Sequence, residues 1–445
     1  MKNIVFFTLC LASLYGETKI NFEKDFDFVL ADVNAKLSSF IYDDYSSMET
    51  TLLANNFEIA QNETDFSDKV VVAKRDELVL IIFKGTSDSD DVSVDLNITL
   101  TDFSPKDLFD GVKVHGGFFG YTNDFLSKVE DIKWDNEKFS DMLDNPSTKY
   151  ILTGHSLGGA VAQLFGAKLE DIYGITPENI LIYGYGVPAV GNEKWAEVFD
   201  TNSTFALKYN YRVVNPLDGV ACTNFYTTSY NQIGKYYLLD ESNNQILNDT
   251  NTTFQKNLCP SLLTFALSQA ENHHISDYTS KLDSFNTKSF FTADEGWSLV
   301  SIPTNTITQP NQITTSDLLW SWNDGVWSAF STQESMLEYI NEHNIEQISQ
   351  LNPKEGFWTQ SKHKFLKFFD GENYGFDDLT FQDGWNLVGI GEDINTSDID
   401  DNLTIWTYAD NKWSLYGKDF NSDVYETYNK LETIKSGSGF WVYKN

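Results

Sequence analysis

The segment KYILTGHSLGGAVAQLFGAKL, which begins at Lys149, constrains the fold of this 445-residue chain more than any other feature. An apolar, partly β-branched run precedes a Gly-x-Ser-x-Gly sequence, and a stretch with helix-like spacing of apolar residues follows it. This order predicts a strand, a sharp turn and a helix, the nucleophile elbow that holds a serine hydroxyl above a sheet. The serine is Ser156, between Gly154 and Gly158, and we expect it to be a nucleophile.

The residues on either side of this segment have the pattern of an α/β domain. Helix-like stretches alternate with the short runs VVVA, LVLIIF, YILTG, ILIYGYG and YRVV. Such alternation predicts a largely parallel sheet with helices packed against it. We expect one α/β domain over residues 17–286.

Residues 1–16 have the layout of a secretory signal peptide, with an early lysine, an apolar run and small residues at the end. The run is too short for a stable membrane anchor. We therefore expect a secreted protein, either extracellular or associated with the cell surface. Cys10 would leave with this segment, so Cys222 and Cys259 would remain. We expect these two to form a disulfide, with two separate buried thiols as the alternative.

The charge of the chain limits its partners. Asp and Glu number 65 against 31 Lys and Arg, which gives a formal net charge of -34 at pH 7. Such a chain repels phosphate backbones and anionic membrane surfaces, so we expect no nucleic-acid partner. Uncharged substrates fit better. No EF-hand or zinc-type spacing stands out, and we expect neither a cofactor nor a metal.

A serine nucleophile needs a histidine base and a carboxylate that orients the histidine. In the chain order Ser, Asp, His, the α/β region offers only the adjacent pair His273 and His274. The ring of His155, beside the serine, should point away from it. The carboxylate should follow a strand, which favours Asp218, just after YRVV, over Asp200, which has no strand before it.

These residues resemble the class 3 lipases, the fungal-type triacylglycerol lipases and their bacterial and plant relatives, over roughly residues 25 to 285. Six segments carry the resemblance in the family's order: FKGTS at Phe83, VHGGF at Val114, GHSLGGA at Gly154, YGVPAVGN at Tyr185, YRVVNPLD at Tyr211 and HHISDY at His273. The resemblance implies an α/β-hydrolase fold and a serine ester hydrolase that acts on ester or lipid substrates.

The resemblance also implies particular site residues. The family's acid is the aspartate of the R-V-V-N-x-x-D segment, which is Asp218 here. Its base is a histidine five positions before a tyrosine, which favours His273, because Tyr278 follows at that distance, and leaves His274 as the alternative base. The family's oxyanion hole corresponds to the backbone N–H groups of Thr86 and Leu157.

Some positions of the chain have another interpretation or depart from the family pattern. Thr86 has the alternative of simply ending a strand, and His115 matches a family position that is mainly structural. Lids of this family present an apolar face to lipid, whereas residues 87–100, SDSDDVSVDLNITL, are acidic with scattered aliphatics. A phospholipase A1, a short-chain carboxylesterase and a feruloyl-esterase-like enzyme therefore stay open as alternatives.

The composition changes near residue 287, because nine of the eleven tryptophans lie beyond it. Three segments also recur there: GWSLVSI at Gly296 as GWNLVGI at Gly384, LLWSWNDGVWSAF at Leu318 as TIWTYADNKWSLY at Thr404, and EGFWTQ at Glu355 as SGFWVY at Ser438. Each copy alternates aromatic residues in short β-like runs. We expect two small β-rich modules, over 287–366 and 367–445.

The aromatic residues of these modules have two interpretations. Alternating aromatics in a small β module usually build its core, and we expect this of most of them. The alternative is that some of them are exposed contacts for a carbohydrate or a surface. A surface-binding or adhesive protein that acts through the repeats is the alternative to an enzyme.

Overall fold

The computed structural model divides into two compact units. The first comprises Met1–Leu239 and Asn248–Asp283, and the second comprises Asp240–Leu247 and Ser284–Asn445. The domain boundaries that the sequence places between residues 286 and 287 and between residues 366 and 367 remain predictions. The structure describes residues 26–61, 69–86, 99–104, 106, 109–135, 137–202, 204–222, 230–239, 244–248, 272–313, 316–362, 364–400, 402–409, 411–417, 420 and 422–444.

Three expectations fall outside the described residues. They are the signal peptide at 1–16, residues 87–98 of the acidic segment 87–100, and Cys259, so the disulfide with Cys222 also stays a prediction. Among the described helices, none is both long and apolar enough to cross a bilayer.

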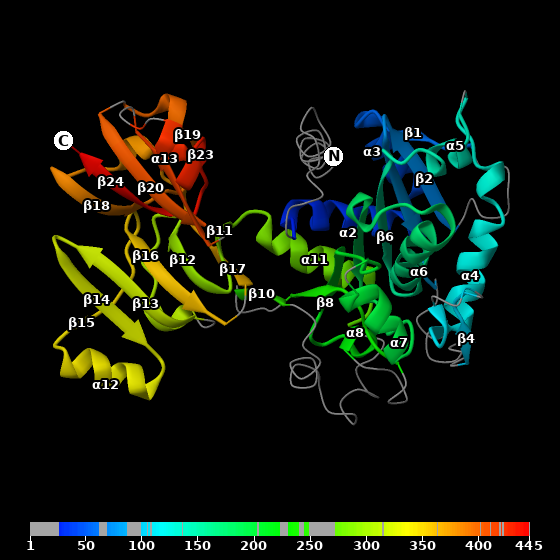
Figure 1. Cartoon of the computed structure of the whole chain (residues 1–445), viewed down its shortest axis with the longest axis horizontal. Helices are drawn as coiled ribbons and strands as arrows, with labels where there is room; N and C mark the ends of the chain where they lie inside the picture. The colour runs from blue at the N-terminus through cyan, green and yellow to red at the C-terminus, as the bar shows by residue number, and fades with distance from the viewer. Residues whose placement is uncertain are drawn as a thin grey trace. The chain divides into compact units, whose positions relative to one another are not determined.

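The first unit is built on a mostly parallel sheet, as the alternating pattern predicts (Figure 1). Its strands, in spatial order, are β1 (Glu58–Ile59), β2 (Val70–Arg75), β3 (Leu78–Phe83), β6 (Lys149–His155), β7 (Ile180–Tyr185), β8 (Tyr209–Val214) and β9 (Lys235–Leu238). The five strands from β3 to β9 are parallel, and β1 and β2 are antiparallel at one edge. A separate pair joins β4 (Leu100–Asp102) to β5 (Lys113–His115).

Helices cover both faces of this sheet, so its central strands β3 and β7 are buried along nearly their whole length. The helices of this unit are α2 (Phe28–Asp43), α3 (Tyr45–Ala54), α4 (Gly116–Leu126), α5 (Phe139–Leu143), α6 (Leu157–Tyr173), α7 (Glu193–Ala196), α8 (Gly219–Cys222) and α11 (Ile275–Phe285).

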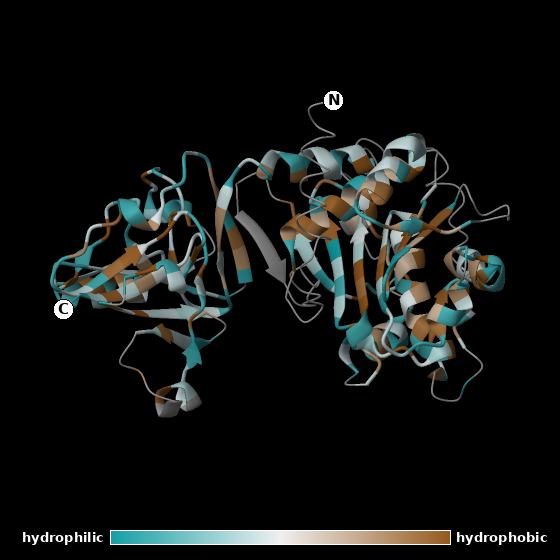
Figure 2. Ribbon diagram, turned by 90° about the horizontal axis from the view of Figure 1, so that it is seen from above, coloured by the Kyte–Doolittle hydropathy of each residue, from teal (hydrophilic) through white to brown (hydrophobic). Residues whose placement is uncertain are grey.

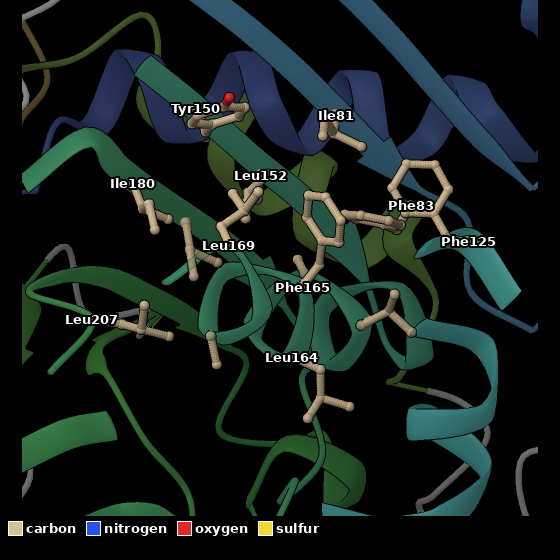
Figure 3. Packing of buried hydrophobic residues seen from close by; sticks show 14 of the residues in the cluster. Ile81, Phe83, Phe125, Tyr150, Leu152, Leu164, Phe165, Leu169, Ile180 and Leu207 are labelled. Carbon is tan, nitrogen blue, oxygen red and sulfur yellow. The ribbon is translucent and has the colours of Figure 1, made fainter. Parts of the chain in front are cut away.

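Strand β6 shows the alternation of its two faces. Tyr150 and Leu152 share a buried cluster with Phe165 of α6, and Figure 3 shows these side chains between the strand and the helix. On the other face, the hydroxyl of Thr153 lies 3.1 Å from that of Ser38 in α2. Figure 2 shows the apolar residues of this unit concentrated in such strands and helices.

The second unit contains two five-stranded sheets with the same strand order. The first runs β12 (Gly296–Ser301), β16 (Gly356–Ser361), β13 (Ser316–Asn323), β14 (Val326–Ser331) and β15 (Glu346–Gln347). The second runs β18 (Gly384–Gly389), β24 (Gly439–Lys444), β20 (Leu403–Ala409), β21 (Lys412–Tyr416) and β22 (Asn429–Lys430). Further elements are α12 (Glu334–Glu342), α13 (Ser422–Thr427), the pair β19 (Ile394–Asn395) and β23 (Thr433–Ile434), and the antiparallel strands β10 (Asn244–Asn248), β17 (Lys364–Phe369) and β11 (Ser289–Ala293).

The two five-stranded sheets meet through equivalent contacts. Val300 bridges Ser438, and at the matching positions of the other copy Val388 bridges Glu355. A Cβ added at Gly356 would lie 2.5 Å from the carbonyl oxygen of Val388. The corresponding Cβ at Gly439 would lie 2.5 Å from the oxygen of Val300. The two copies therefore associate around an approximate two-fold axis.

The tryptophans of the second unit differ from expectation. Its buried clusters consist of aliphatic residues, phenylalanines and one tyrosine, and none of the nine tryptophans is among the buried residues. The expectation that most of the aromatic repeat residues form the core is wrong for these nine. Each sheet has two faces rich in apolar residues, and only one of them is buried.

Candidate active site

The turn between β6 and α6 holds Ser156 in a strained conformation. Its φ of 56° and ψ of -125° lie where side chains are rarely tolerated. A Cβ at Gly158 would lie 2.2 Å from the carbonyl oxygen of Phe83, and one at Gly154 would lie 2.4 Å from the carbonyl carbon of Gly158. Only glycine fits on either side, as the Gly-x-Ser-x-Gly pattern predicts.

The structure brings Ser156, His273 and Asp218 together. Nε2 of His273 lies 2.8 Å from Oγ of Ser156, and Nδ1 lies 2.8 Å from Oδ2 of Asp218. A carboxylate only accepts hydrogen bonds, so Nδ1 carries the proton and Nε2 accepts from the serine hydroxyl. All three side chains are buried. Serine hydrolases activate their nucleophile through such a relay of hydroxyl, imidazole and carboxylate.

Asp218 is fully buried and is surrounded by donors. The backbone N–H groups of Val220 and Ala221 donate to Oδ1 at 2.8 and 3.3 Å, and the Tyr278 hydroxyl donates to Oδ2. A buried carboxylate without such partners would be costly, so these donors satisfy its oxygens and fix its orientation. The sequence pointed to Tyr278 only as a spacing marker.

The two alternative residues, His274 and Asp200, lie elsewhere. His274 is exposed, and it is His273 whose ring occupies the position between the serine and the acid. Asp200 accepts the backbone N–H of Gly234 at 2.8 Å, in the helical turn Glu197–Thr201. Neither residue reaches the relay.

The ring of His155 points away from the serine hydroxyl but still belongs to the site. Its Nε2 lies 2.6 Å from the backbone oxygen of His273, so Nε2 is the donor and Nδ1 the acceptor. Nδ1 lies 3.2 Å from the hydroxyl of Tyr42, which in turn accepts the N–H of Gly85 at 3.0 Å. Burial, with the neighbouring His273, lowers the pKa of His155 well below its ordinary value, so its ring stays neutral.

Gly85 precedes Thr86, one of the two expected oxyanion donors. Strand β3 ends at Phe83, which pairs with Gly154 of β6, so residues 84–86 leave the sheet beside the elbow. Leu157 is the first residue of α6, and the N–H groups of a helix's first turn have no partner within the helix. Both positions therefore suit donors to an anion near Ser156.

His115 lies outside the relay. It caps α4, and its Nδ1 accepts the N–H of Phe118 at 3.3 Å. Burial lowers its pKa to about 4. This placement agrees with a mainly structural role.

Comparison with known proteins points to the class 3 lipases. Residues 80–227 match the family described as Lipase (class 3), a segment that includes Thr86, Ser156 and Asp218 and ends before His273. A lipase of Rhizopus niveus is 30% identical over 138 residues, which are 30% of this chain and 32% of that protein. The secreted mono- and diacylglycerol lipase 1 of Fusarium solani is 33% identical over 146 residues, 32% of this chain and 40% of the relative.

The triacylglyceride lipase of Rhizomucor miehei aligns at 22% identity with a TM-score of 0.42, covering 55% of this chain and 95% of that one. The chain spans about a third of the length of the curated relatives it matches.

Proposed function

We propose that this protein is a serine hydrolase that cleaves carboxylic esters of the acylglycerol type. The observation that carries the proposal is the unbroken relay from Ser156 through His273 to Asp218, at a turn that only glycine neighbours allow. The family match over 80–227 and the lipase names of the relatives support an ester substrate.

The relay accounts for acyl transfer to water. His273 accepts the Ser156 proton as the oxygen attacks the ester carbonyl, and Asp218 stabilises the resulting imidazolium. The N–H groups of Thr86 and Leu157 would stabilise the oxyanion, a contribution worth about 10² to 10³ in rate per donor. His273 then protonates the leaving alcohol, and water releases the acyl group by the same steps.

A fluorophosphonate probe and p-nitrophenyl esters from acetate to palmitate test this proposal. We expect labelling and hydrolysis by the wild-type chain, loss of both in Ser156→Ala, and retention of both in Ser276→Ala, an exposed serine of α11. Serine-independent hydrolysis, or no labelling, would overturn the proposal.

A short-chain carboxylesterase is the second candidate, favoured by the acidic segment at 87–98. An acidic sequence in place of the apolar lid that lipases of this family have would give no advantage at a lipid interface. The same ester series decides, because activity confined to the short esters indicates an esterase. Activity that rises with chain length indicates a lipase, and release of the sn-1 acyl chain from phospholipid would indicate a phospholipase A1.

Secretion is part of the proposal. The layout of residues 1–16 supports it, as does the word secreted in the name of the Fusarium relative. Amino-terminal sequencing of protein from the culture medium tests it, with cleavage near residue 16 as the expected result. Mass analysis before and after reduction would test the proposed disulfide between Cys222 and Cys259.

A further inference from the structure

The second unit has a hollow of about 370 Å³ whose lining consists of Trp297, Trp320, Trp327 and Trp358, here called the first quartet. These side chains stay partly accessible, and Trp327 is 41% exposed. The buried cluster of the same sheet lies on its other face, with Leu319 among its members. The hollow is therefore an open aromatic surface and not part of the core, which is typical of a binding surface.

The other repeat copy has tryptophans at all four equivalent positions, here called the second quartet: Trp385, Trp406, Trp413 and Trp441. The ring pairs also match. Trp297 and Trp358 lie 6.4 Å apart at 81°, against 6.2 Å and 89° for Trp385 and Trp441. The rings of Trp320 and Trp327 lie 6.1 Å apart at 82°. Those of Trp406 and Trp413 lie 6.0 Å apart at 73°. Each copy thus holds two pairs of nearly perpendicular rings.

The two quartets touch each other symmetrically. Trp358 lies 5.7 Å from Trp413 of the other copy, and its counterpart Trp441 lies 6.1 Å from Trp327. The approximate two-fold axis of the sheets therefore also relates the quartets, and they form one continuous aromatic layer.

The repeated feature of this layer is aromatic and not polar. Gln360 pairs with Trp297 across β12 and β16, but the equivalent residue in the other copy is Tyr443. The polar group beside the ring therefore differs between the copies, an amide in one and a phenol in the other, whereas the indole rings are repeated. What both copies present is indole rings set at right angles, and the face of an aromatic ring carries negative potential.

The sign of the charge favours a cationic ligand. The chain has a formal net charge of -34. Among the described residues, no lysine or arginine is found over a ring of either quartet, whereas Lys74 lies over Trp134 in the first unit at 5.1 Å. No lysine or arginine of the described part of the chain therefore occupies these aromatic faces. A quaternary ammonium group is the ligand that several aromatic faces recognise best.

We propose that the two quartets bind the trimethylammonium groups of choline headgroups on a lipid surface. The choice of a lipid as the source of these groups rests on the proposed ester hydrolase function. The recognition of the ammonium group rests on the quartets alone.

Titration of the full-length Ser156→Ala chain with choline and with 3,3-dimethylbutan-1-ol, its uncharged isostere, tests the recognition. We expect choline to bind at least threefold more tightly than the alcohol. Trp320→Leu and Trp406→Leu keep apolar bulk and remove one aromatic face from each quartet. Each should weaken choline binding by about 3- to 30-fold at its own site, with little effect on the alcohol.

Tyr339→Leu, which alters an exposed aromatic residue of α12, is the matched control and should bind choline normally. Equal binding of choline and the alcohol would overturn the proposal and show a purely apolar site. Binding of soluble oligosaccharides in place of choline, or binding of neither, would overturn it as well. Thermal unfolding of each variant shows whether a loss of binding reflects misfolding.

Co-sedimentation with vesicles tests the source. We expect Ser156→Ala to bind phosphatidylcholine vesicles and not phosphatidylethanolamine vesicles, which carry a primary ammonium at the same net charge. Binding of free choline without binding of these vesicles would refute the lipid surface. Hydrolysis of a soluble short ester by the wild-type chain is measured in parallel and reports on the proposed function alone, so failure of this inference and failure of the proposed function are distinguishable.

Discussion

Substitution of Tyr42 by phenylalanine tests whether the hydrogen bonds beneath the active site serve catalysis. The tyrosine hydroxyl accepts the N–H of Gly85 and donates to Nδ1 of His155, whose Nε2 holds the backbone of His273. One hydroxyl thus connects the loop before Thr86 to the segment that carries the base. The phenyl ring fills nearly the same volume, so the change removes these two hydrogen bonds and keeps the packing of the ring.

The magnitude follows from the groups that lose a partner. His155 is buried and Gly85 is half-buried, and a buried unsatisfied group costs about 1 to 3 kcal/mol. Tyr42→Phe should therefore lower the free energy of unfolding by about 2 to 4 kcal/mol, or Tm by roughly 5 to 15 °C for a unit of this size. A displaced Thr86 N–H should reduce kcat by about 10- to 100-fold, part of the loss caused by removal of a whole oxyanion donor. KM should change less than twofold, because the bonds do not contact the ground-state ester.

The assay is hydrolysis of a soluble p-nitrophenyl ester, with thermal unfolding followed in parallel. Tyr45→Phe, at a 47% exposed tyrosine close by in sequence, is the matched control and should leave both quantities unchanged. A variant with kcat within twofold of wild type and a Tm lower by several degrees would refute the catalytic part of the reasoning. The hydrogen bonds of Tyr42 would then serve stability and not catalysis.

Two further predictions concern stability. Burial lowers the pKa of His115 to about 4, whereas the pKa of the unfolded residue is about 6.5. The neutral ring therefore contributes about 2 to 3 kcal/mol to the free energy of unfolding above pH 6.5, and this contribution is lost as pH falls toward 4. In His115→Asn, which keeps a good N-cap, urea unfolding at pH 4 and pH 8 should differ by that much less than in wild type, and an equal difference would contradict the assignment. Gly356→Ala should destabilise the second unit by about 1 to 3 kcal/mol, because the added Cβ would lie 2.5 Å from the backbone oxygen of Val388. Tryptophan fluorescence during urea unfolding measures this loss, and Gly120→Ala, whose Cβ meets nothing within 4 Å, should not show it.

The parts of the site that the sequence predicts are those with a local signal. Ser156 lies between a strand pattern and a helix pattern, and Asp218 comes four residues after β8 ends, so each position follows from its own neighbours. Only the resemblance to the class 3 lipases favours His273 over the adjacent His274. Tyr42 could not be predicted, because it lies 113 residues from His155 and no short pattern of α2 marks it.

The tryptophans show the same limit on a larger scale. In β13, Leu319 is buried and Trp320 is half-buried, although both residues are apolar enough for a core. Alternation predicts two faces but not which of them packs, because that choice depends on strands β11 and β17, which cover one side. The periodic pattern therefore predicted the strands correctly and the burial of their aromatic residues wrongly.

The duplication of the quartets has a consequence for the kind of ligand that suits them. A single aromatic site for an ammonium group is weak, worth about 0.5 to 2 kcal/mol per cation–π contact. Two sites on one chain strengthen each other only when the ligand is itself repeated, because the second contact is then intramolecular. A soluble choline molecule gains nothing from the second quartet, whereas a surface of closely spaced headgroups does. Removal of one quartet should therefore weaken vesicle binding far more than it weakens the binding of free choline at the remaining site.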